Sequence, residues 1–70
     1  MVAIASTIED AMVQFGILIR SCPYRFSGQW FVAKTGGNEF VAYRTKKAAV
    51  KNSVLDHLWT IGRRCSTVSG

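Results

Sequence analysis

Cysteine and histidine are scarce in this sequence, which limits the metal and redox chemistry it can support. Its 70 residues include two cysteines, Cys22 and Cys65, and one histidine, His57. These residues form no CxxC pair and no other zinc-binding spacing, so we expect no metal site and no cofactor. A disulfide between the two cysteines is conceivable, but a reducing compartment favours free thiols.

Acidic residues are few, and the sequence predicts a non-catalytic role for each of them. Glu9 and Asp10 suit the first turn of a helix, where negative charge is favoured, and Glu39 can pair across a hairpin. His57 follows Asp56, but no nucleophile lies at a spacing that would form a triad with them. Phosphate-binding glycine motifs are also missing. We therefore expect that the protein is not an enzyme.

Long apolar runs are absent, and no stretch approaches the ~20 residues of a membrane span. The N-terminal apolar stretch has no basic start and is interrupted by Glu9 and Asp10, which is unlike a signal peptide. The sequence therefore predicts a cytoplasmic protein with no membrane partner. With 49% hydrophobic and 19% charged residues, it fits one globular domain over 1–70, with flexible ends at 1–5 and 65–70.

What the sequence has in excess is positive charge. Nine lysines and arginines against four acids give a net charge of +5, and the isoelectric point is near 9.8. Such a balance favours anionic partners, either nucleic acid or an acidic protein surface.

A first helix is predicted over Thr7–Ile19. Ser6 and Glu9 have the spacing of a capping box, in which each side chain accepts from the other's backbone N–H. Apolar residues follow at helical spacing. Pro23 cannot continue the hydrogen-bond ladder and therefore ends the helix before it.

Three strands are predicted next, over Tyr24–Phe26, Gln29–Lys34 and Glu39–Arg44. The last two flank Gly36-Gly37, a strong signal for a two-residue hairpin turn. That turn would set Lys34 opposite Glu39, Val32 opposite Val41 and Trp30 opposite Tyr43. Because side chains alternate, the opposite side of the sheet would then hold a Phe/Ala set suited to receive helices. That set is Phe31, Ala33, Phe40 and Ala42.

A second helix is predicted over Thr45–Gly62, with Thr45 as N-cap and Gly62 as a left-handed C-terminal residue. Its predicted apolar stripe consists of Val50, Val54, Leu58 and Ile61. Its start carries Lys46, Lys47 and Lys51, although the backbone dipole there is already positive. A lysine cluster in this position suits an anionic ligand. The expected fold is a two-layer α+β domain of order α-β-β-β-α, with both helices on one face of a three-stranded antiparallel sheet.

This element order and the start of the second helix resemble the double-stranded-RNA-binding domain. The matching residues are Lys46, Lys47 and Ala49, with Lys51 one position beyond the family's third lysine. The resemblance implies that the lysines lie over phosphates of a duplex. The loop at Ser27-Gly28 is too short for the family's histidine-bearing minor-groove loop. The strand–Thr-Lys-Lys–helix stretch is also similar to the three-stranded DNA-binding domains at the N-termini of tyrosine integrases.

Two functions are consistent with these patterns. The first is a nucleic-acid-binding module that contacts the phosphates of duplex RNA or DNA. Its candidate contact residues are Lys46, Lys47, Lys51, Arg44 and Arg25. The alternative is a small regulator or inhibitor of the phage or plasmid type that binds another protein through an aromatic outer face of the sheet. A homodimer could form through the same face. Its candidate interface residues are Trp30, Val32, Val41 and Tyr43.

Overall fold

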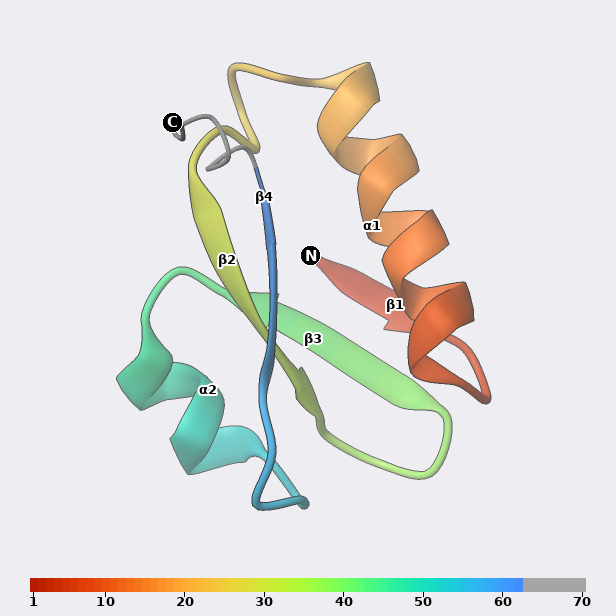
Figure 1. Ribbon diagram of the computed structural model, residues 1–70, viewed down its shortest axis with the longest axis vertical. Helices are drawn as coiled ribbons and strands as arrows, with labels where there is room; N and C mark the ends of the chain where they lie inside the picture. Colours follow the sequence, from red (N-terminus) through yellow and green to blue (C-terminus); the bar gives the residue numbers. More distant parts are fainter. Residues whose placement is uncertain (63–70) are drawn as a thin grey trace.

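The computed structural model describes residues 1–62, which form a four-stranded antiparallel sheet and two helices (Figure 1). The strand order across the sheet is β1-β3-β2-β4. The α+β class is confirmed, whereas the sheet has four strands rather than three. The elements in chain order are β1 (Val2–Ile4), α1 (Ile8–Ser21), β2 (Gln29–Lys34), β3 (Glu39–Tyr43), α2 (Lys46–Asn52) and β4 (Trp59–Gly62).

Helix α1 confirms the first predicted helix. Its N-cap is Thr7, whose hydroxyl accepts from the Asp10 amide at 3.3 Å, so the cap lies one residue later than expected. Ala11, Phe15 and Ile19 are buried along one side. Their spacing of four residues places them on one stripe, which seats the helix on the sheet.

The N-terminal residues were expected to be a flexible end, but they form the edge strand β1. Val2 pairs with Val41 and Ile4 with Glu39 on β3. Ala3 and Ala5 are buried against the core. Their small side chains let β1 run close to α1. This packing helps to stabilise a strand that is too short to form many hydrogen bonds with β3.

The hairpin between β2 and β3 has a register one residue away from the predicted one. Lys34 lies opposite Phe40, and Val32 lies opposite Ala42. The Thr35 amide donates to the Glu39 carbonyl at 2.9 Å, which leaves a three-residue loop instead of a two-residue turn. Positive φ occurs at neither glycine of this loop, so the two-residue turn that needs it does not form.

This one-residue shift changes which side chains enter the core. Trp30, Val32, Phe40 and Ala42 now share the side that faces α1, and all four are buried. The predicted Phe/Ala face was therefore wrong. The observed register buries the indole of Trp30 together with Phe40, which removes more apolar surface from water than the predicted set would.

The predicted second helix is divided into α2 and β4. Helix α2 ends at Asn52, whose side chain donates back to the Ala48 carbonyl at 2.9 Å. Ser53 then forms a local turn in which its hydroxyl accepts from the Leu55 amide at 3.1 Å. Asn and Ser side chains compete in this way for backbone hydrogen bonds and so favour helix ends.

The residues after this turn form the edge strand β4 beside β2. Trp30 pairs with Ile61, and Val32 pairs with Trp59. Aromatic and β-branched residues suit a pleated, half-buried strand. The helical stripe expected here is not buried, because Val50 and Val54 are both exposed. Gly62 belongs to β4 and is not a helix C-terminal residue.

The two helices lie on opposite faces of the sheet. Helix α1 packs against the edge strands β1 and β4, whereas α2 packs against the central strands β2 and β3 (Figure 1). Ala33 is fully buried on the face that alternation sets opposite Val32, and Ala49 is the buried residue of α2. Within the described chain, the main core takes no side chain from α2. The expectation of both helices on one face was therefore wrong.

The backbones of Gly28 and Gly62 meet where β4 joins the start of β2, and both residues have positive φ. A Cβ on Gly62 would collide with the Gly28 carbonyl oxygen. Gly62→Ala is therefore expected to lower the free energy of unfolding by about 2 kcal/mol or more. Gly37→Ala is the control, because its added Cβ meets nothing within 4 Å. Urea denaturation followed by tryptophan fluorescence measures both, and equal stability of the two variants would contradict the contact.

Candidate nucleic-acid interface

Arg44 holds together the corner between the end of β3 and the start of β2. Its guanidinium donates to the carbonyl oxygens of Ser27 and, at 3.2 Å, of Arg25. The same group lies over the Trp30 ring, with its Cζ 4.0 Å from the ring centroid. Such stacking combines cation–π attraction with planar contact. Arg44 therefore fixes the turn before β2, and part of its donor capacity is used within the protein.

The turn that Arg44 holds was predicted to be a strand over Tyr24–Phe26, and that prediction was wrong. The Phe26 amide donates locally to the Cys22 carbonyl at 3.0 Å. The Phe26 carbonyl accepts from the indole N–H of Trp30 at 3.1 Å. With its backbone groups satisfied in this way, the segment is a compact turn that has no strand partner.

Arg25 lies in the same turn and is exposed. Its Cζ is 5.7 Å from the centroid of the Phe26 ring, so the guanidinium packs on an aromatic side chain while remaining open to solvent. The Arg44 bond to the Arg25 carbonyl joins this residue to the start of α2, because Arg44 is followed directly by the Thr45 cap. The two predicted arginines are therefore brought together.

The lysines stand on α2, which Thr45 caps by accepting from the Ala48 amide at 3.2 Å. This cap confirms the predicted helix start. At 3.6 residues per turn, Lys47 and Lys51 share one side of the helix, about 160° from the buried Ala49. They therefore point away from the sheet. Lys46 is also exposed but lies on a different side, so the three lysines do not form a single line.

The positive charge of this corner affects the nearby N-terminal amino group. The Met1 nitrogen donates to the Ala42 carbonyl at 3.5 Å. Burial lowers the pKa of the Met1 amino group, and the charge of Arg44 lowers it further.

The aromatic outer face proposed for protein binding does not exist in this fold. Trp30 is only 8% exposed and Val32 is fully buried, both on the side that faces α1. Val41 and Tyr43 are half-buried on the opposite side. The one-residue register shift separates the pairs, so these four residues cannot form one interface.

One exposed aromatic residue was missed by the sequence analysis. Tyr24 is 96% exposed in the turn held by Arg44, directly beside Arg25. Its assignment to a strand hid this feature. The signal that could have found it is Pro23, which places the next residue at the tip of a turn after a helix end.

The described residues contain no group of three or more potential metal ligands among histidine, cysteine, aspartate and glutamate. Cys22 is an exposed free thiol. Cys65 and the rest of the expected flexible end at 65–70 lie outside the described residues. In residues 1–62, neither helix has the length and apolar character needed to cross a membrane.

Comparisons with known proteins return no relative of this chain. No protein-family model matches it, and searches of curated proteins and of solved structures find no match.

Removing the Arg44 clamp tests whether it holds the corner. Arg44→Ala is expected to lower the free energy of unfolding by about 1–2 kcal/mol, because two hydrogen bonds and the stacking on Trp30 are lost. Arg44→Lys recovers little of this loss, since an ammonium group cannot reproduce the planar fork. Arg25→Ala serves as the matched control, with an expected change within about 0.5 kcal/mol. Thermal unfolding of the three variants provides the measurement; an unchanged Arg44→Ala would exclude the clamp.

Proposed function

We propose that this protein is a small non-catalytic module that binds the phosphate backbone of duplex nucleic acid. The observation that carries the proposal is the outward side of α2, where Lys47 and Lys51 stand one turn apart, opposite the buried Ala49. Helix α2 contains no acidic residue that would neutralise them. Two ammonium groups on one side of a helix can contact phosphates of one strand without reading bases.

The corner held by Arg44 carries further positive charge close to the start of α2 in the chain. Lys46 begins α2 two residues after Arg44, and Arg25 is joined to Arg44 through its carbonyl oxygen. The guanidinium of Arg44 lies over Trp30, on the face of the sheet opposite to α2. The arginines therefore add to the net positive charge that attracts a polyanion from a distance, but they do not continue the lysine side of α2.

The resemblance to double-stranded-RNA-binding domains now depends on fewer features. The element order is β-α-β-β-α-β rather than α-β-β-β-α, so the order does not support it. The shared lysines remain, and Ala49 is buried against the sheet, which is the role a small residue needs in that position. The support for binding therefore comes from the lysine geometry rather than from the fold.

Charge reversal on α2 tests the proposal. Lys47→Glu together with Lys51→Glu is expected to abolish binding to labelled duplexes in fluorescence anisotropy. For the unmodified protein, the logarithm of affinity should fall with the logarithm of salt concentration by about 0.9 per phosphate contacted on DNA. Lys34→Glu is the net-charge control for Lys47→Glu alone, because each replaces one positive charge by one negative charge. The Lys34 ammonium lies away from the lysines of α2, over the Phe40 ring, 5.7 Å from its centroid. No binding at low salt, or equal losses in reversal and control, would refute the proposal.

Tyr24 allows duplex binding to be separated from single-strand binding. A duplex keeps its bases stacked, so Tyr24→Ala is expected to leave duplex affinity unchanged. Stacking of an unpaired base on an aromatic ring contributes about 1–3 kcal/mol. If labelled single strands bind more tightly than duplexes in the same assay, and Tyr24→Ala weakens that binding tenfold or more, the ligand is single-stranded and the proposed duplex contact fails.

A further inference from the structure

One stripe of α1 remains uncovered beside the sheet. It consists of Glu9, Val13, Gly16 and Arg20, whose spacing of four, three and four residues keeps them within an arc of about 60°. Val13 is 61% exposed, although the same helix packs on the core through its other side. The stripe therefore carries an acid at one end, a base at the other and apolar positions between them.

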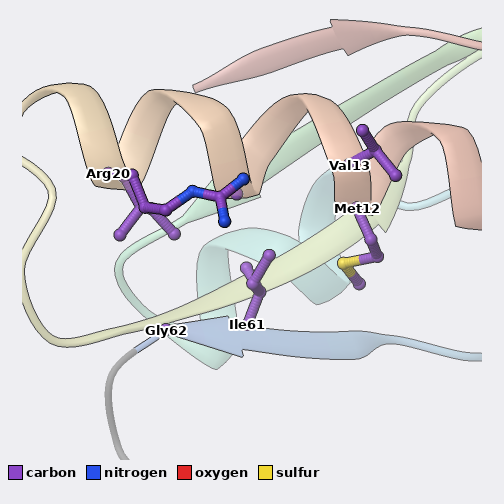
Figure 2. Close-up of a pocket in the computed structure, with 7 residues that line it drawn as sticks. Met12, Val13, Arg20, Ile61 and Gly62 are labelled. Carbon is purple, nitrogen blue, oxygen red and sulfur yellow. The ribbon is translucent and has the colours of Figure 1, made fainter.

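A groove opens next to this stripe, between α1 and β4 (Figure 2). Its volume is about 320 Å³, and its lining is mainly apolar. Met12 reaches from α1 and Ile61 from β4 into the groove, and the Arg20 side chain lies along its side. A Cβ on Gly16 would meet nothing within 4 Å, so the wall of the groove is recessed at this position. Val13 is thus an apolar side chain that projects beside an apolar recess at Gly16.

We infer that a second copy of this chain docks antiparallel along the stripe. A two-fold axis placed between residues 14 and 15 brings Val13 of each copy to Gly16 of the other. The same axis brings Glu9 of each copy to Arg20 of the other. In a two-fold interface every contact occurs twice, so the stripe must complement itself, and this stripe does so in both shape and charge.

The alternatives lack this complementarity. A parallel pair would set Glu9 against Glu9 and Arg20 against Arg20, and like charges in contact oppose association. An unrelated protein would need its own matched acid, base and projecting side chain, whereas a second copy already has them. Glycine at the crossing permits two helices to approach closely, which strengthens their van der Waals contact. Helix α2 lies on the other face of the sheet, so the dimer leaves both lysine surfaces free.

The first test fills the recess. Sedimentation velocity of the whole chain at increasing concentration is expected to show a monomer–dimer equilibrium. Gly16→Leu should shift it to monomer, because the added side chain occupies the site of Val13 from the other copy. The added Cβ has open space, and leucine favours a helix over glycine, so the fold is retained; thermal unfolding checks this. A monomeric parent chain, or a dimer that Gly16→Leu leaves intact, overturns the inference.

The second test uses the charges. Glu9→Arg and Arg20→Glu each place like charges at both ends of the pair, and each is expected to weaken dimerisation roughly tenfold or more. A mixture of the two variants restores both opposite-charge contacts. The mixture should therefore form a one-to-one heterodimer, although each variant alone is monomeric. Association of either variant alone at the parent level, or no association in the mixture, overturns the inference even if nucleic-acid binding is observed.

Discussion

The pairing of Val32 with Ala42 determines which half of the sheet's side chains faces α1. Because alternation in a strand has a period of two, every residue of β2 follows this choice, and the neighbouring strands β1 and β4 follow in turn. Trp30 and Phe40 then meet Phe15 in one apolar core. In a chain of 70 residues this core has few substitutes, since small domains bury a smaller share of their surface. The placement of both helices, the corner held by Arg44, the lysine side of α2 and the exposed stripe of α1 therefore all depend on this register.

Arg44 links this core to the start of α2, the helix that carries the lysines. Its guanidinium stacks on Trp30, which is buried because of the register, and binds the carbonyls of the turn before β2. A residue that would be counted as one more surface charge from the sequence therefore has a structural role. The same contacts set the position of the chain entering α2. The start of α2, which carries the lysines, is consequently positioned by backbone and aromatic contacts of the residue that precedes its cap.

Local signals in the sequence predicted the parts of the fold that local chemistry decides. The hydroxyl cap at Thr45, the first helix and the strands on each side of the glycine pair all depend on neighbouring residues, although the first helix is capped by Thr7 and not by Ser6. The register could not be predicted, because it depends on which loop allows Trp30 and Phe40 to share a core. The strand β4 was missed for a similar reason. Its residues also match a helical period, and only pairing with β2 makes them a strand.

The candidate site was predicted unevenly for the same physical reason. The lysines of α2 are exposed as expected, since charged residues rarely find burial without partners. The grouping of Trp30 with Tyr43 failed because it required the correct register. Tyr24 was missed because turn geometry, not residue type, decides its exposure. The exposure of a single charged residue can therefore be predicted from the sequence, whereas a surface made by several strands cannot be predicted without the register.

The shortness of α2 has a consequence for how binding and folding are linked. Seven residues are far fewer than the ~12–15 at which an isolated helix becomes even marginal in water. The spacing of its ammonium groups therefore exists only while Ala49 stays seated on the sheet. A polyanion that selects this spacing would draw the equilibrium toward the native chain by mass action. Nucleic-acid binding and the folded state would then be lost in the same cooperative transition when the protein is heated.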